Sequence, residues 1–174
     1  MTDRLELLLT DEGVDLATLR RVWMEPVTVR LSPEVEHKLN RSVQVIEEIV
    51  AQGKTVYGVN TGFGLLAQTR ISDGELTTLQ RNLVLSHSVG VGAPLDPRAV
   101  RLAMVLKVVA LGRGCSGVRP TVVEALCRLL EHDVYPVIPS KGSVGASGDL
   151  APLAHMSAVL LGVGMLAGGS TALV

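Results

Sequence analysis

The sequence predicts a mainly α-helical fold, interrupted by two glycine-rich loops and a few short strands. Three observations support this fold class. Apolar residues recur at helical spacing in several segments, and these segments begin at Ser, Asp or Pro start signals. Aromatic residues make up only 2% of the 174 residues, so the core must consist of Leu, Val, Ile and Ala. A chain of this length can bury the core of one domain, so we expect residues 1–174 to form a single domain.

A short strand and a long helix are expected first. The strand is predicted at residues 26–31, PVTVRL. Residues 32–34 then supply a hydroxyl cap, a proline in the first turn and an acid near the positive helix end. The apolar face of this helix comprises Val35, Leu39, Val43, Ile46 and Val50. Gly53 is placed to end it.

A loop and three further helices follow. YGVNTGFG at 57–64 holds three glycines in eight positions and is predicted to be a loop. Residues 72–75 match a capping box at the start of a helix that continues to His87. The helix from Asp96 to about Leu111 is apolar nearly all round and is expected to be deeply buried. Another helix begins at Pro120.

The last predicted elements surround the second glycine-rich loop. YPVIP at 135–139 is predicted to be extended, because proline disfavours helix in the preceding residue. Residues 140–150 are dense in Gly and Ser and form the loop. A helix from about Leu150 to Leu161 follows, with Pro152 tolerated in its first turn.

Charge and composition exclude several functions. A net charge of −1 and the scarcity of aromatic residues disfavour nucleic acid as a partner. Two cysteines form no disulfide framework, and the N-terminus lacks a long apolar segment, so a cytoplasmic location is expected. The four histidines and two cysteines show no metal-ligand spacing. Residues 156–174 carry no charge, which leaves a membrane span as an alternative to a buried helix with a Gly-rich exit.

One generic motif points to a nucleotide. Residues 112–117 fit G-x-G-x-x-G, the dinucleotide fingerprint, which requires a strand before it and a helix after it. Here a long apolar run with a helix cap precedes the motif, and no other β-α-β pattern stands out. An ordinary loop is the favoured interpretation.

The most specific segment is Gly145-Ala146-Ser147-Gly148-Asp149, directly before a predicted helix. By themselves, these five residues also fit a flexible loop with a capping aspartate. The sequence around 43–164 nevertheless resembles the aromatic amino acid ammonia-lyase and aminomutase family. The resemblance implies that Ala146, Ser147 and Gly148 cyclise into 4-methylidene-imidazole-5-one. Glycine presents an uncrowded amide nitrogen for this reaction, and the serine hydroxyl leaves as water. Asp149 is expected to cap the helix and support the ring.

Two further segments carry the resemblance. Residues 57–64 look like the family's tyrosine loop, which implies that Tyr57 is the base taking the substrate's β-proton, with Asn60 and Gly64 at the substrate. Residues 79–92 resemble the substrate-selecting helix, and the Ser86-His87 pair is the form associated with the histidine branch. His87 can hydrogen-bond an imidazole, which an apolar pocket cannot do. Taken alone, Tyr57 and His87 also fit an ordinary loop tyrosine and a core histidine.

The resemblance therefore implies elimination of ammonia from L-histidine to urocanate, with no external cofactor or metal. It also implies a homo-oligomer, a tetramer in the family. Another aromatic amino acid lyase or aminomutase, and a folded but inactive fragment, remain as alternatives. Family members are much longer, so we expect the C-terminal helical part to be missing. The apolar stretches 99–111 and 156–167 are then expected to be exposed unless the fragment self-associates. Lys107 and Val109 depart from the family's usual Arg-x-Asn.

Overall fold

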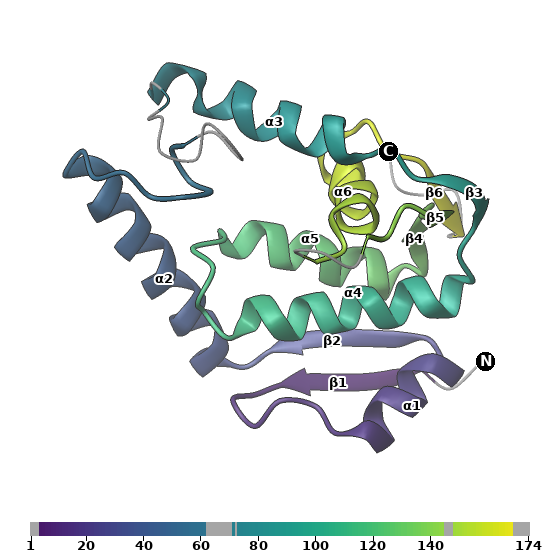
Figure 1. Cartoon of the computed structure of the whole chain (residues 1–174). Helices are drawn as coiled ribbons and strands as arrows, with labels where there is room; N and C mark the ends of the chain where they lie inside the picture. Colours follow the sequence, from purple (N-terminus) through teal and green to yellow (C-terminus); the bar gives the residue numbers. More distant parts are fainter. Residues whose placement is uncertain (1–3, 62–70, 72, 145–147, 169–174) are drawn as a thin grey trace.

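A computed structural model of the chain describes residues 4–61, 71, 73–144 and 148–168. Helices predominate, which confirms the mainly α-helical prediction (Figure 1). In chain order the elements are β1 (Leu5–Leu9), α1 (Leu16–Met24), β2 (Val27–Leu31), α2 (Pro33–Ala51), α3 (Leu76–His87), β3 (Val91–Pro94), α4 (Pro97–Gly112), α5 (Pro120–Glu131), β4 (Val134–Pro136), β5 (Pro139–Lys141), α6 (Leu150–Ala158) and β6 (Leu166–Gly168). Short 3₁₀ turns occupy Asp73–Glu75 and Val159–Leu161.

The described strands form three two-stranded sheets. β1 and β2 are parallel, with α1 as the connection between them, and their register runs from Leu5 opposite Val27 to Leu9 opposite Leu31. β3 pairs with β5, and β4 pairs with β6, both antiparallel. The β1–α1–β2 unit corrects the expectation that no β-α-β pattern exists. The strand predicted at 26–31 is confirmed as β2, whereas β1 and α1 were not predicted from the sequence.

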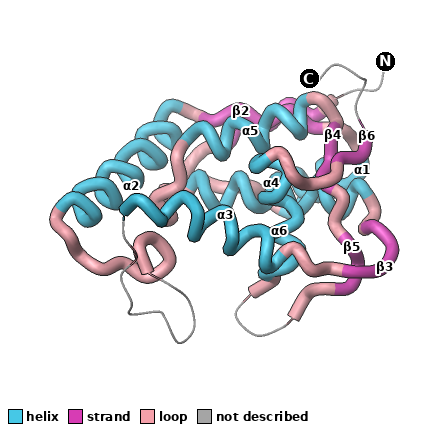
Figure 2. Tube along the Cα trace, turned by 90° about the horizontal axis from the view of Figure 1, so that it is seen from above, coloured by secondary structure: helices cyan, strands magenta, loops and turns pink. Residues whose placement is uncertain are grey.

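Helix α4 forms the centre of the fold. It packs against α1, α2 and α5, with the β1–β2 sheet beside it (Figures 1 and 2). Met104, Val105 and Val108 are completely buried there. This confirms the predicted burial for one face of the helix. The expectation that residues 99–111 are exposed holds only for the other face, where Leu106 is 44% exposed.

The second stretch expected to be exposed, residues 156–167, is only partly so. Met156 and Ala158 are buried at the end of α6, whereas Met165 is 67% exposed. The chain leaves α6 through a 3₁₀ turn and Gly162, whose φ of 71° ends the helical path. Among the described residues, every helix is too short or too polar to cross a membrane.

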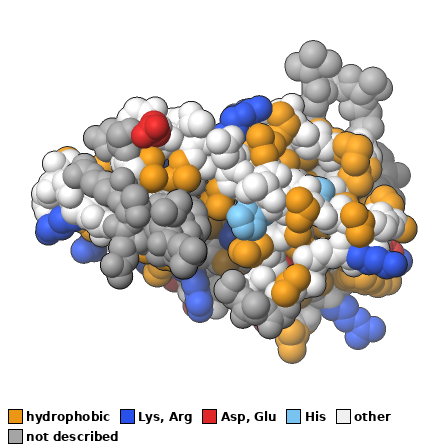
Figure 3. All heavy atoms as spheres, turned by 45° about the horizontal axis from the view of Figure 1, so that its top comes forward, with side chains coloured by type: hydrophobic (Ala, Val, Ile, Leu, Met, Phe, Trp, Pro, Cys, Tyr) orange, Lys and Arg blue, Asp and Glu red, His pale blue; other side chains and the backbone are white. Residues whose placement is uncertain are grey.

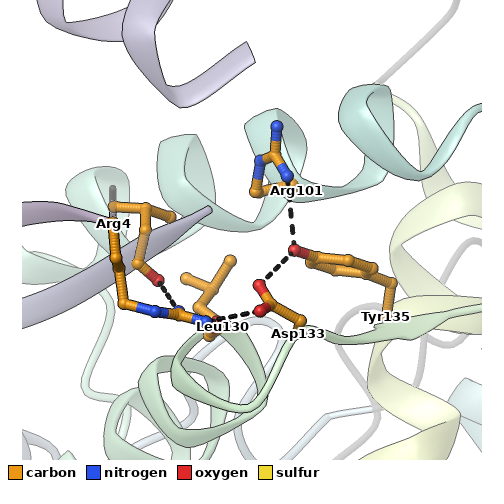
Figure 4. Close-up of polar contacts among 6 residues, drawn as sticks. Arg4, Arg101, Leu130, Asp133 and Tyr135 are labelled. Carbon is orange, nitrogen blue, oxygen red and sulfur yellow. Dashed lines mark hydrogen bonds and ion pairs between the residues drawn. The ribbon is translucent and has the colours of Figure 1, made fainter. Parts of the chain in front are cut away.

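A polar network joins the N-terminal β-α-β unit to the rest of the fold (Figure 4). Arg101 of α4 donates to the Tyr135 hydroxyl at 3.4 Å, and that hydroxyl donates to the Asp133 carboxylate at 2.9 Å. Arg4, directly before β1, forms an ion pair with the same carboxylate. The network links elements more than a hundred residues apart in the sequence.

Local start signals placed four helices correctly. The Ser32 hydroxyl accepts from the Val35 amide, and the Asp96 carboxylate accepts from the Arg98 amide, at the starts of α2 and α4. The capping-box prediction at 72–75 includes Ser72, which lies outside the described residues, and it stays a prediction. Residues 73–75 form a 3₁₀ turn, and the α-helix α3 follows from Leu76.

Candidate functional site

A small cavity lies between the end of α3 and the start of α6. Its volume is about 230 Å³. The residues lining it are Ser86, His87, Val89, Gly142, Val144, Gly148, Leu150 and Ala151. The cavity therefore brings together three residues that the sequence assigned to one site: Ser86, His87 and Gly148. A larger hollow of about 660 Å³ lies between the β1–α1 loop and helices α2 and α4, and no predicted site residue lines it.

The rim of the cavity is largely apolar. Val89, Val144 and Leu150 are each half or more exposed, at 66%, 67% and 50%. Figure 3 looks onto this side of the molecule, where exposed hydrophobic side chains lie beside histidine side chains. An apolar rim with few polar groups is typical of small-molecule sites.

The hydrogen bonds of His87 fix the roles of its two ring nitrogens. Nδ1 lies 2.8 Å from the carbonyl oxygen of Leu83, one turn earlier in α3. A carbonyl oxygen can only accept, so Nδ1 carries a proton, and in the neutral ring Nε2 is the acceptor. The Ser86 hydroxyl lies 3.2 Å from the same Nδ1 and donates to the same carbonyl. His87 thus offers the cavity an acceptor nitrogen suited to an N–H group.

The opposite wall begins with Gly148. Its φ is +112°, a conformation that L side chains rarely adopt, and the space where a Cβ would lie is empty to 4 Å. Glycine is therefore required by the backbone rather than by crowding. The Ala146 and Ser147 predictions lie outside the described residues.

Asp149 is at the N-cap position of α6, as predicted, but its carboxylate makes no cap hydrogen bond there. It accepts instead from the hydroxyl of Ser143, on the other side of the loop. The contact ties the two ends of the glycine-rich loop together. Sequence reasoning missed Ser143, since one serine among several in a loop carries no distinguishing signal.

The tyrosine loop is held by Asn60. This side chain is completely buried; its oxygen accepts from the Val56 amide at 2.7 Å, and its nitrogen donates to the Lys54 carbonyl at 2.9 Å. Both contacts shape the loop itself, and the substrate-binding role of Asn60 stays a prediction. Tyr57 stands out from the loop and is 64% exposed. Gly64 lies outside the described residues.

Helix α3 connects the tyrosine loop to the cavity. The Gln80 amide group donates to the carbonyls of Gly58 and Val59 at 3.4 Å. His87 lies seven residues further along the same helix, about 10 Å at the usual helical rise. Tyr57 is not among the residues that line the cavity. The structure therefore places His87 and Gly148 together and the tyrosine loop further along α3. Gln80 belonged to the predicted segment but was not singled out.

His155 of α6 makes a contact close to the cavity. Its Nε2 accepts a hydrogen bond from the Gly90 amide at 3.0 Å. This contact crosses from α6 to the segment directly after α3. Gly90 follows His87 by three residues in the sequence.

The G-x-G-x-x-G segment connects α4 to α5, with a helix rather than a strand before it. A Cβ on Gly114 would lie 2.7 Å from the Lys38 carbonyl oxygen, and one on Gly117 would lie 2.3 Å from Ile46. Close packing on α2 accounts for these glycines. In the part of the chain that the structure describes, no three or more His, Cys, Asp or Glu side chains form a group able to hold a metal. Lys107 is half-buried, and Val109 packs against the core.

Comparison with known proteins agrees with these features. A family model described as aromatic amino acid lyase matches residues 14–172. A histidine ammonia-lyase of Salmonella choleraesuis is 58% identical over 158 residues, which cover 91% of this chain and 31% of that protein.

Solved structures show the same fold. A histidine ammonia-lyase from Trypanosoma cruzi has a TM-score of 0.80 and 36% identity, covering 95% of this chain and 31% of that one. A tyrosine aminomutase from Streptomyces globisporus has a TM-score of 0.84 and 33% identity, covering 93% and 30%. An ergothioneine-degrading ergothionase from Treponema denticola has a TM-score of 0.89 and 26% identity, covering 94% and 33%. The chain thus spans about a third of the length of each relative.

Proposed function

Because the chain belongs to the aromatic amino acid lyase family, we propose that it forms the N-terminal part of a histidine ammonia-lyase. The reaction is elimination of ammonia from L-histidine to give urocanate. The observation that carries the proposal is the shared cavity, which is lined both by His87 and by the glycine that ends the Ala-Ser-Gly segment. The match to the Salmonella relative covers 31% of that protein, so the activity of a whole enzyme is part of the proposal.

The proposal includes the prosthetic group 4-methylidene-imidazole-5-one, and Gly148 is the described residue that supports it. Gly148 has the open, positive-φ backbone that an attacking amide nitrogen needs. To form the group, that nitrogen would bond to the carbonyl carbon of Ala146, and two waters would leave, one with the carbonyl oxygen and one with the Ser147 hydroxyl. Once formed, the group supplies an electrophilic carbon for the substrate's amino nitrogen.

His87 is proposed to select the substrate. Its Nε2 acceptor can take the N–H of an imidazole ring, whereas the phenyl ring of phenylalanine has no donor to offer. A site built to hydrogen-bond a substrate discriminates strongly against analogues that lack the group. The apolar rim of Val89, Val144 and Leu150 can pack against the ring at the same time.

Tyr57 is proposed as the base that removes the β-proton. Support comes from the family resemblance of its loop and from the docking of that loop on α3 through Gln80. The exposed position of its side chain is compatible with a substrate lying against it.

The same proposal includes a homo-oligomer and a cytoplasmic location. The exposed apolar side chains around the cavity support contact with further protein, and two cysteines suit a reducing compartment. We expect the 174-residue chain alone to turn over little or no L-histidine. The 58% identity to a Salmonella histidine ammonia-lyase favours the histidine enzyme over other lyases and aminomutases of the family.

A chimera tests the proposal. In it, this chain replaces the matching segment of the Salmonella histidine ammonia-lyase, and urocanate formation is measured beside a panel of phenylalanine and tyrosine. We expect histidine to be the preferred substrate, and intact mass to show loss of two waters mapped to residues 146–148. Ser147→Ala should abolish both urocanate formation and the loss of two waters. A correctly assembled chimera that keeps its unmodified mass, or prefers another amino acid, contradicts the proposal.

A further inference from the structure

Three backbone segments meet at Gly90. Its amide donates to His155 of α6, and a Cβ on Gly90 would lie 3.1 Å from that ring nitrogen. A Cβ on Gly142, which leaves β5, would lie 3.0 Å from the Gly90 Cα. Directly beside this point, Val91 of β3 pairs with Lys141 of β5. Gly90 therefore contacts the chain both before and after the loop 143–149.

This meeting point lies behind the cavity. His87 precedes Gly90 by three residues, and Gly142 itself lines the cavity. On the other side, α6 begins with Leu150 and Ala151, which also line it. The hydrogen bond from Gly90 to His155 thus crosses between the element carrying His87 and the element that follows Gly148.

Burial alone holds α3 weakly. None of its residues with a described side chain is fully buried, whereas α4 buries seven. α3 packs against α6, but through half-covered apolar residues. A directional hydrogen bond at its C-terminal end therefore has a large share in fixing its position, because little buried apolar area does so.

We propose that His155 is a positioning residue, whose hydrogen bond from the Gly90 amide keeps His87 in register with the loop that ends at Gly148. The effect on turnover rests on the proposed function; the hydrogen bond and its effect on α3 do not. A misplacement of about 1 Å between bound substrate and reacting group lowers rate by about a hundredfold. Loss of the bond should therefore lower kcat more than it raises KM, because His87 remains present to bind.

The first experiment needs no activity. Hydrogen exchange of the Gly90 and Val91 amides is measured in the 174-residue chain for His155→Leu, His155→Gln and the control His37→Leu, an exposed histidine of α2. Leucine fills similar space without an acceptor, and glutamine can place Oε1 near the position of Nε2. We expect the Gly90 amide to exchange at least tenfold faster in His155→Leu than in the parent. In His155→Gln and His37→Leu it should exchange at the parent rate. An unchanged rate in a folded His155→Leu protein overturns the proposal.

The second experiment uses the chimera. We expect His155→Leu to lower kcat about a hundredfold with a smaller change in KM, and to leave part of the protein without the two-water mass loss. His155→Gln should restore both, and His37→Leu should match the parent. Normal kcat and complete modification in His155→Leu overturn the positioning role. If the parent chimera itself is unmodified and inactive, the proposed function fails, while the Gly90 exchange rates still decide the contact.

Discussion

Replacing Arg101 by methionine should destabilise the fold more than the same replacement at an exposed arginine. Arg101 is the charged residue that is buried in the described part of the chain, at 7% exposure. Its Nε donates to the Val22 carbonyl at 2.6 Å, and its Nη2 donates to the Trp23 carbonyl at 2.7 Å. Both carbonyls belong to the last turn of α1, where no helical N–H remains to pair with them. The positive guanidinium also faces the negative end of that helix.

The size of the effect follows from these contacts. A hydrogen bond to a charged group contributes about 1.5–3 kcal/mol net, so two contribute about 3–6 kcal/mol. Methionine keeps the apolar stem and avoids burying a charge, which offsets part of the loss. We therefore expect Arg101→Met to lower the free energy of unfolding by about 3 kcal/mol. Domains of this size have about 5–15 kcal/mol in total, so the change is large.

Urea unfolding followed by circular dichroism measures this. The matched control is Arg98→Met, one turn earlier on α4, whose exposed guanidinium lies 5.1 Å from the centre of the Trp23 ring and pairs with Asp96. The control should shift the urea midpoint little, because exposed pairs contribute little. An Arg101→Met protein that unfolds at the parent midpoint with an unchanged m-value would refute the reasoning, since the buried bonds would then add nothing net.

Two further predictions follow from shifted pKa values. Burial raises the pKa of the Cys127 thiol to about 11, whereas Cys115 is exposed. Iodoacetamide at about pH 8.5 should therefore alkylate Cys115 first, and equal rates by peptide mass mapping would count against this. The hydrogen bonds from the Arg98 side chain and amide lower the pKa of Asp96 to about 2, from 3.8. Its stabilisation is therefore present above about pH 4 and is lost as pH falls through about 2. The difference in unfolding free energy between the parent and Asp96→Asn should shrink over that range; a constant difference would contradict the assignment.

Much of the secondary structure could be predicted because its signals are local. The caps of α2 and α4 each depend on a side chain and an amide two or three residues away. The extended segment around 135–139 depends on prolines next to it. The same holds for the glycine-rich loops, where Gly148 requires glycine through its own φ angle. Such effects depend on residues that are adjacent in the sequence.

The site was predictable only as a set of residue types. Ser86, His87 and Gly148 were assigned to one site, and the cavity brings them together. The partner of His155 could not be predicted from the sequence, because Gly90 lies 65 residues away. The β1–β2 pairing and the network around Arg101 were missed for the same reason.

The sequence by itself determined the local features of this protein: most of the helical segments, and where glycine is needed. Only the tertiary structure decided which surfaces meet, so that α3 and α6 enclose one cavity and Asp149 binds Ser143 instead of capping α6. The physical reason is range. Helix caps and turns are settled within about four residues, whereas contacts between distant segments depend on how the whole chain buries its apolar surface.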